Sequence, residues 1–351
     1  MSLLIKEQKR TTISILKPQK IHNIEQEYNK PAELFCNDTI IPSACLRCIS
    51  PRCIKYHDSE INCDTFPDFV QERANHVCPV EAIHWNYEKE FPEINHQQCI
   101  SCGLCANRCP IGAIYKAEGK MKISEPTDNY ENLSIDKDSL AKQFALINTL
   151  DKIYWKHKFQ KESDIIMEQL YSDISKFDGN SIIPNLLIRN ILIALNYSCA
   201  ISRKGDVYTR MDAVYSSNSM QDCKGVIEIE FGRDTLEASR GILDDIAVLH
   251  SRKQLDKSEN TPLVICLSLP NKRQGYFQVV KDINRVLDLK IQTISLGALM
   301  IFLWNDSVIN FNAKDFFIDY DHMSIRNSSE YRLGRSIELS HGKLGILEPN
   351  K

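Results

Sequence analysis

Cys99-Ile-Ser-Cys102-Gly-Leu-Cys105-Ala-Asn-Arg-Cys109-Pro110 places four cysteines at the spacing C-x2-C-x2-C-x3-C-P. Thiolates are the ligands that proteins use for soft metal centres, and three of them spaced by two residues can wrap one corner of an iron-sulfur cube. Gly103 lets the backbone pass close to sulfide, and Pro110 turns the chain away without an unneeded donor. The stretch predicts that this chain holds iron.

A second, looser copy of the run lies upstream. Cys45-Leu-Arg-Cys48 is followed by Cys53 and, after a long insertion, by Cys78-Pro79. The residues that follow also match, because Cys78-Pro-Val-Glu-Ala-Ile-His-Trp85 aligns with Cys109-Pro-Ile-Gly-Ala-Ile-Tyr115. Self-similarity of this kind indicates an internal duplication, and therefore two metal centres.

The two runs resemble those of bacterial two-cluster ferredoxins. In that family the fourth cysteine of each run ligates the other cluster. The resemblance implies two [4Fe-4S] clusters, one held by Cys45, Cys48, Cys53 and Cys109, the other by Cys78, Cys99, Cys102 and Cys105. Cys36 and Cys63 are extra thiols, and either could replace Cys53. A pair of zinc sites is the alternative, because C-x2-C spacing also suits tetrahedral zinc.

Composition is typical of an intracellular protein. Most of the thirteen cysteines crowd one segment, whereas a disulfide scaffold spreads them over a small secreted chain. Leu3-Leu4-Ile5 is too short for the apolar core of a signal peptide, and the apolar run 296–304 is too short to span a bilayer. We therefore expect a cytoplasmic protein with no membrane segment.

The 351 residues are long enough for two domains. Cysteine, proline and aromatic density falls between residues 120 and 140, which predicts a domain boundary there, and the resemblance implies a ferredoxin-like α+β domain over 1–125. A helical connector is expected over 126–180, where apolar residues recur at three or four positions. Residues 181–351 form the second predicted domain, with a C-terminal extension.

The second domain shows alternating helix and strand patterns. Helices are expected over 184–195, 234–251, 278–287 and 296–304, and strands over 197–201, 206–215, 225–231, 263–269 and 290–294. This order predicts an α/β domain with a mixed central sheet flanked by helices.

Three acidic residues fall on two of these strands. Glu228 and Glu230 are two residues apart and so point to one face, where they can meet Asp212 of the preceding strand. Carboxylates in such a group suit Mg²⁺ or Mn²⁺. The opposing interpretation is that both glutamates face solvent and that Asp212 caps a turn.

The element order and these acids resemble the restriction-endonuclease-like PD-(D/E)xK nucleases over residues 180–305. The resemblance implies that Asp212, Glu228 and Glu230 are catalytic and hold the metal, which would activate water for phosphodiester hydrolysis. The usual lysine at the last motif position is replaced by Glu230. The fold alone does not establish this activity.

We therefore expect a metal-dependent DNA nuclease of defence or repair that carries an iron-sulfur module. One rival is an electron-transfer subunit of an oxidoreductase with a silent C-terminal docking domain, and another is a noncatalytic nucleic-acid-binding subunit. Expected partners are DNA and a protein such as a helicase, a methylase or a redox protein. With 43 basic and 46 acidic residues, any DNA-binding face must be local. Candidates for it are Arg203, Lys204, Arg210, Lys272, Arg273, Lys281 and Arg285.

Overall fold

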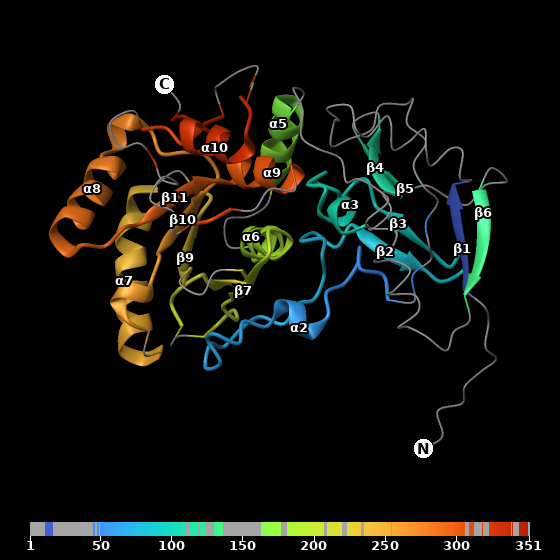
Figure 1. Cartoon of the computed structure of the whole chain (residues 1–351), viewed down its shortest axis with the longest axis horizontal. Helices are drawn as coiled ribbons and strands as arrows, with labels where there is room; N and C mark the ends of the chain where they lie inside the picture. Colours follow the sequence, from blue (N-terminus) through green and yellow to red (C-terminus); the bar gives the residue numbers. More distant parts are fainter. Residues whose placement is uncertain are drawn as a thin grey trace. The chain divides into compact units, whose positions relative to one another are not determined.

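The computed structural model (Figure 1) forms two compact units. The first comprises Met1–Lys55 and His76–Gln160, and the second comprises Tyr56–Asn75 and Lys161–Lys351. The structure describes residues 11–16, 45, 48, 50–109, 113–117, 120–123, 130–135, 163–176, 181–206, 209–219, 223–232, 235–253, 255–305, 309–311, 318, 323–337, 339 and 344–349.

The first unit is built from antiparallel strand pairs (Figure 1). Strand β2 (Ile83–Asn86) pairs with β3 (Phe91–Ile94), and β4 (Ile114–Ala117) pairs with β5 (Lys120–Ile123). A third pair joins β1 (Thr11–Leu16) to β6 (Tyr130–Ile135). The short helix α3 (Leu104–Arg108) carries Cys105. This mixture of short strands and helices is consistent with the predicted α+β ferredoxin-like domain.

The sequence repeat is also a structural repeat. Strand β2 begins five residues after Cys78, and β4 begins five residues after Cys109. In both copies the amide four residues on donates to the cysteine sulfur, from Ala82 to Cys78 Sγ at 3.2 Å and from Ala113 to Cys109 Sγ at 3.2 Å. The thiols of Cys78 and Cys109 therefore accept the same backbone hydrogen bond in both copies.

The second unit contains a five-stranded sheet in the order β11-β10-β9-β8-β7. Strands β7 (Tyr197–Ile201), β8 (Ala213–Ser217) and β9 (Lys224–Glu230) pair antiparallel. Strands β9, β10 (Leu263–Cys266) and β11 (Gln292–Ser295) pair parallel. The predicted mixed sheet is therefore confirmed. That this domain has the restriction-endonuclease-like fold stays a prediction. The expected strand over 206–215 starts later, so that Asp212 lies just before β8.

Helices flank this sheet on both sides (Figure 1). Helices α6 (Ile183–Ala194) and α9 (Leu296–Trp304) contact each other on one side, and α7 (Thr235–Lys253) contacts α8 (Tyr276–Leu287) on the other. Every residue of β10, β11 and α9 is buried, which marks the centre of the core. Two short 3-10 helices span Lys257–Glu259 and Lys272–Gln274, and α10 (Arg326–Leu333) lies in the C-terminal extension.

The expected helical connector is only partly described. Helix α5 (Ser163–Ile174) lies within it, but residues 130–135 form strand β6 instead of a helix. The antiparallel partner β1 supplies the hydrogen bonds that favour the strand there. Residues 136–162 and 177–180 lie outside the described residues. None of the helices that the structure describes is long and apolar enough to cross a membrane.

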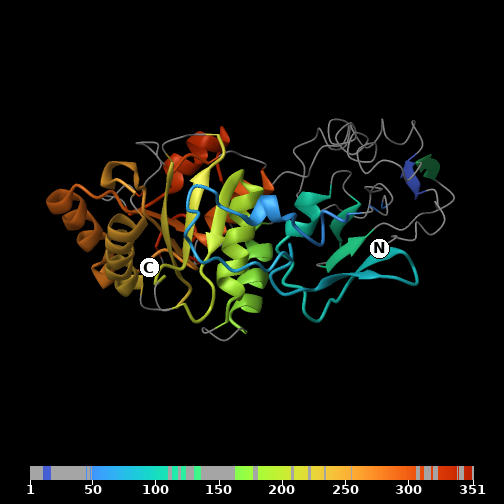
Figure 2. The ribbon, with the colours of Figure 1, turned by 90° about the horizontal axis from the view of Figure 1, so that it is seen from below.

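Most of the insertion between Cys53 and Cys78 belongs to the second unit. We call its residues 56–75 the arm; it contains the short helix α2 (Asp58–Ile61). The arm pairs with the end of β7, because Glu72 N donates to Ile201 O at 2.8 Å and Arg203 N donates to Val70 O at 3.0 Å. Figure 2 shows the arm, in blue, running beside the strands. It covers an edge of the sheet whose backbone groups would otherwise lack partners.

Candidate iron-sulfur centre and acidic cleft

The cysteines of the first unit gather in two sets. Cys48 and Cys53 each lie close enough to Cys45 and Cys109 for their charges to interact. Likewise, Cys105 lies close to Cys78, Cys99 and Cys102. These are the two groups expected from the ferredoxin resemblance, each completed by the fourth cysteine of the other run. The role of these thiols as cluster ligands stays a prediction.

Cys53 and Cys105 connect the two sets. Their charges interact, although each belongs to a different set. None of the described cysteines forms a disulfide. Two groups of thiols held this near to each other would place two redox centres side by side.

A mostly apolar pocket surrounds the set Cys45, Cys48, Cys53 and Cys109. Trp85 and Pro92 of the first hairpin line it together with Ala113 and Ile114 of the second repeat. An apolar wall limits solvent access to a metal centre and so affects its reduction potential. The soft thiol donors and this wall fit an iron-sulfur cluster.

The thiols of both sets have raised pKa values. Burial, followed by the neighbouring Cys109 and Cys45, raises the pKa of Cys48 to about 12. Burial and adjacent thiols also raise the pKa values of Cys53 and Cys105. Cluster ligands are thiolates, and bound iron would supply the positive charge that favours their deprotonated form. Amide donors such as Ser101 N, 3.4 Å from Cys99 Sγ, would then stabilise the charged sulfur.

The two extra thiols are placed differently. Cys63 lies in the arm, is buried, and contacts Ser198 O of β7 at 4.0 Å. It therefore belongs to the packing of the second unit. Cys36 lies outside the described residues.

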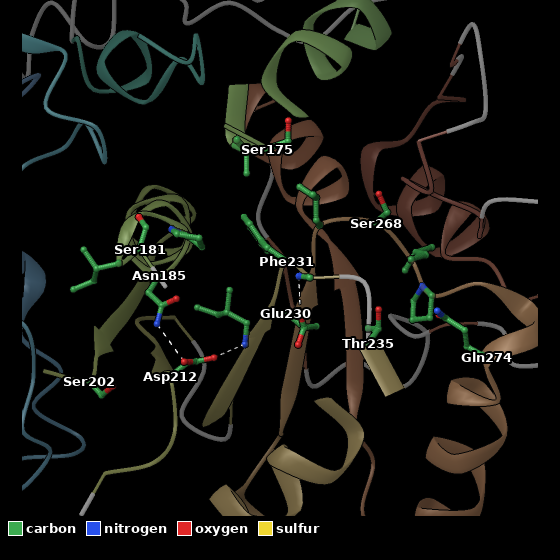
Figure 3. A pocket seen from close by; sticks show the side chains of 18 of the residues that line it. Ser175, Ser181, Asn185, Ser202, Asp212, Glu230, Phe231, Thr235, Ser268 and Gln274 are labelled. Atoms are coloured by element: carbon green, nitrogen blue, oxygen red, sulfur yellow. Dashed lines mark hydrogen bonds between the residues drawn. The ribbon is translucent and has the colours of Figure 1, made fainter. Parts of the chain in front are cut away.

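Asp212 is held at the start of β8 by its backbone and its side chain. Its Oδ2 accepts from Ile229 N at 2.9 Å and its Oδ1 accepts from Asn185 Nδ2 at 3.3 Å (Figure 3). Its backbone oxygen accepts from Ser202 N at 2.9 Å. Burial raises the pKa of Asp212, while the two donors lower it. The carboxyl is thus fixed in position beside β9.

Glu228 lies beside Asp212 and faces helix α7. The register that pairs Ala213 with Ile227 puts Glu228 directly opposite Asp212. A methyl group added at Gly241 of α7 would meet Glu228 Oε1 at 2.9 Å, so the carboxyl lies over this glycine. Burial, Asp212 and Asp245 together raise the pKa of Glu228 to about 9. This glutamate is therefore protonated at neutral pH unless a cation is near.

Asp245 is an acidic neighbour that the sequence analysis did not identify. It lies one helical turn after Gly241 on the buried side of α7, hydrogen-bonded to Glu228. Burial raises its pKa to about 7, and among the described residues its Oδ2 has no hydrogen-bond partner. The sequence does contain a sign of this site, because Asp245 falls at the helical spacing of the buried apolar residues Ile242, Ile246 and Leu249.

Glu230 lies at the end of β9, and its charge also raises the pKa of Glu228. Its Oε1 accepts from Gly232 N at the end of β9 (Figure 3). Asp212 and Glu230 line one cleft, whereas Glu228 faces α7. Within the described part of the chain, no three His, Cys, Asp or Glu side chains lie close enough together to hold a single metal ion, so the three acids do not form such a group. The expected convergence of three carboxylates on one cation therefore stays a prediction.

The cleft itself has a volume of about 1020 Å³. It opens where β9 and β10 end, between Phe231, Leu267 and the first turn of α6 (Figure 3). Ligands of open α/β sheets commonly bind outside the carboxyl ends of the strands. Of the candidate basic residues, Lys204 lines the cleft, and the exposed pair Lys272 and Arg273 follows directly after the lining residue Asn271.

Comparisons with known proteins match the cysteine-rich segment. Residues 92–115 match the family model described as a 4Fe-4S binding domain. An uncharacterised ferredoxin of Methanocaldococcus jannaschii is 39% identical over 56 residues, which is 15% of this chain and 36% of that protein. The uncharacterised ferredoxin-like protein YdhY of Escherichia coli is 31% identical over 55 residues, 16% of this chain and 26% of that protein.

A third relative carries a more specific name. A protein of Hydrogenibacillus schlegelii named ferredoxin 7Fe is 44% identical over 39 residues, 11% of this chain and 47% of its own length. The alignments thus span less than half of each of these relatives. No solved structure matches the chain. The segment around Cys99–Cys109 identifies a ferredoxin-like domain that binds a 4Fe-4S cluster.

Proposed function

We propose that this chain holds two [4Fe-4S] clusters and that its second unit is a DNA nuclease dependent on Mg²⁺ or Mn²⁺. The observation that carries the nuclease proposal is the half-buried carboxyl pair Asp212 and Glu228, which the register of β8 and β9 places opposite each other just before β8 begins. Like-charged carboxyls kept this close are unfavourable without a counter-cation, and such sites are often functional. The strand order supports the same proposal by its likeness to the PD-(D/E)xK pattern.

The roles of the residues follow from their positions. Asn185 and the Ile229 amide hold the Asp212 carboxyl in place. It would therefore bind a cation with little further loss of side-chain entropy. Glu228 would ionise on cation binding, and Glu230 would orient water within the cleft. A bound Mg²⁺ supplies polarisation of the phosphodiester and a more acidic water. Lys204 would contact a backbone phosphate at the cleft wall.

Anaerobically purified protein tests this proposal. Plasmid and single-stranded DNA are incubated with and without Mg²⁺ or Mn²⁺, using wild type, Asp212→Asn and Glu228→Gln. Asp244→Asn is the matched control, because Asp244 is exposed on the same helix as Asp245. We expect both site variants to lose cleavage by about 100-fold or more while the brown cluster absorbance is unchanged.

Each other outcome has a definite meaning. If the site variants cut DNA as fast as Asp244→Asn does, the active site is wrongly assigned. Iron-replete wild type that retains DNA without cutting it supports a noncatalytic nucleic-acid-binding subunit instead.

A second candidate function is electron transfer, favoured by the proximity of Cys53 and Cys105. Two cubes whose ligands are neighbours would relay electrons between partner proteins. Under this alternative, reversible reduction of the clusters proceeds equally in wild type and Glu228→Gln, and a redox partner turns over in proportion to cluster content. Cluster spectra followed during reduction, with and without a candidate flavoprotein, distinguish this function from the nuclease.

A further inference from the structure

The arm is fastened to the second unit by a buried arginine. Arg189 of α6 is fully buried, and its Nη2 donates to Ala74 O at 2.6 Å. Its Nη1 donates to Glu72 O at 3.4 Å and its Nε donates to Asn190 Oδ1 at 3.1 Å. A buried charge that loses its acceptors is costly. Release of the arm would therefore leave this guanidinium without two of its partners.

The base of the arm is a short antiparallel ladder. Tyr56 N donates to Asn75 O at 2.7 Å, Lys55 pairs with His76, and Val77 N donates to Ile54 O at 2.8 Å. The chain passes between its two units within this ladder, once in each direction. Cys53 directly precedes Ile54 and Cys78 directly follows Val77. The two ends of the ladder are therefore joined to one predicted ligand of each cluster.

The far part of the arm contacts residues that border the cleft. Gln71 pairs with Ser202, and Arg203 N donates to Val70 O. Ser202 N in turn donates to Asp212 O, and both residues line the cleft. A continuous run of backbone hydrogen bonds thus leads from the arm to Asp212.

We propose that the arm couples cluster occupancy to the order of the cleft edge formed by residues 201–203 and Asp212. Ligation of Cys53 and Cys78 fixes the two ends of the ladder and so lowers the entropy cost of pairing the arm with β7. Loss of the clusters frees both ends, and local opening of the arm then exposes Glu72 N and Arg203 N, the two amides that bond the arm to residues 201–203. Coupling of this kind acts through local stability and needs no displacement of a rigid body.

The proposal rests on the two clusters of the proposed function, but it does not depend on nuclease activity. Hydrogen exchange measured by mass spectrometry on the full chain, with and without clusters, tests it without any nucleic acid. We expect peptides that cover 70–75 and 201–204 to exchange about fivefold faster or more after iron removal. Peptides of β10 and β11 serve as the internal control and should keep their protection.

The reverse direction gives a second test, because energetic coupling is reciprocal. Arg189→Lys keeps the positive charge but lacks the fork that reaches both carbonyls. We expect its cluster absorbance to bleach in an iron chelator about fivefold faster or more than that of wild type. Arg240→Lys, an exposed change on α7, should bleach at the wild-type rate.

The outcomes separate the two proposals. Equal exchange at 201–204 with and without clusters overturns the coupling, whatever the protein does to DNA. If the iron-free chain also loses protection in β10 and β11, the exchange test no longer isolates the arm, and the bleaching rates become the deciding test. Equal bleaching rates for Arg189→Lys and Arg240→Lys would then overturn the coupling. Coupling in a protein that cuts no DNA would refute the nuclease alone.

Discussion

At the scale of single residues, Glu228 has the most altered environment among the proposed catalytic acids. Burial, Asp212 and Asp245 raise its pKa from 4.5 to about 9. Because the folded-state pKa is raised, protonated Glu228 makes its full contribution to stability below about pH 4.5, where it is also protonated in the unfolded chain. This contribution is lost as pH rises through 9. Glu228→Gln keeps a neutral side chain of similar size at every pH. We predict that the variant is more stable than wild type by about 1–2 kcal/mol at pH 9, and by less at pH 5.

Denaturant unfolding of metal-free protein at both pH values checks this prediction, with Asp244→Asn as the control. A difference between Glu228→Gln and wild type that does not change with pH would contradict it. Strand alternation and the nuclease resemblance led to Glu228 and Asp212 as candidates, although Asp212 lies just before β8 and not on it. Asp245 could not be identified in this way, since its nearness to Glu228 depends on how α7 crosses β9.

At the scale of elements, Gly225 allows β9 to pack closely against residues 260 and 261. A methyl group at Gly225 would come within 2.5 Å of Thr261 O and 2.5 Å of Asn260 Oδ1. Thr261 cannot move freely, because its amide donates to Lys224 O at 2.9 Å and its oxygen accepts from Tyr215 Oη at 2.7 Å. We predict that Gly225→Ala lowers the free energy of unfolding by about 2–3 kcal/mol.

The matched control is Gly232→Ala, whose added methyl meets only the flexible carboxylate end of Glu230. Denaturant midpoints that fall equally in the two variants would show that the Thr261 contact is unimportant. The sequence predicted β7, β9 and β10, because their apolar runs are strong local signals. It did not predict the arm as part of this sheet, since the pairing of Glu72 with Ile201 joins residues far apart in the chain. The strand β6 was missed for the same reason, as its partner β1 is equally distant.

At the scale of the whole molecule, the two units depend on different sources of stability. The described part of the first unit consists of short strand pairs, one short helix and two groups of largely half-buried thiols. Small domains with little core commonly need metal to fold. The second unit has its own core, in which β10, β11 and α9 are buried throughout. Iron should therefore stabilise the first unit far more than the second.

We predict that anaerobic iron removal lowers the melting temperature of the first unit by about 10 °C or more, because ligand binding energy is part of the folding energy of such domains. The second unit should still melt cooperatively near its original temperature, with only the arm opened. Calorimetry measures the two melting transitions. Limited proteolysis assigns each transition to a unit, because early cleavage falls either within residues 76–109 of the first unit or within 201–305 of the second. Return of iron and sulfide should restore the first transition, which excludes irreversible damage as the cause. Iron-free protein that resists cleavage within 76–109 as well as the iron-loaded protein does would show that the first unit folds without its clusters.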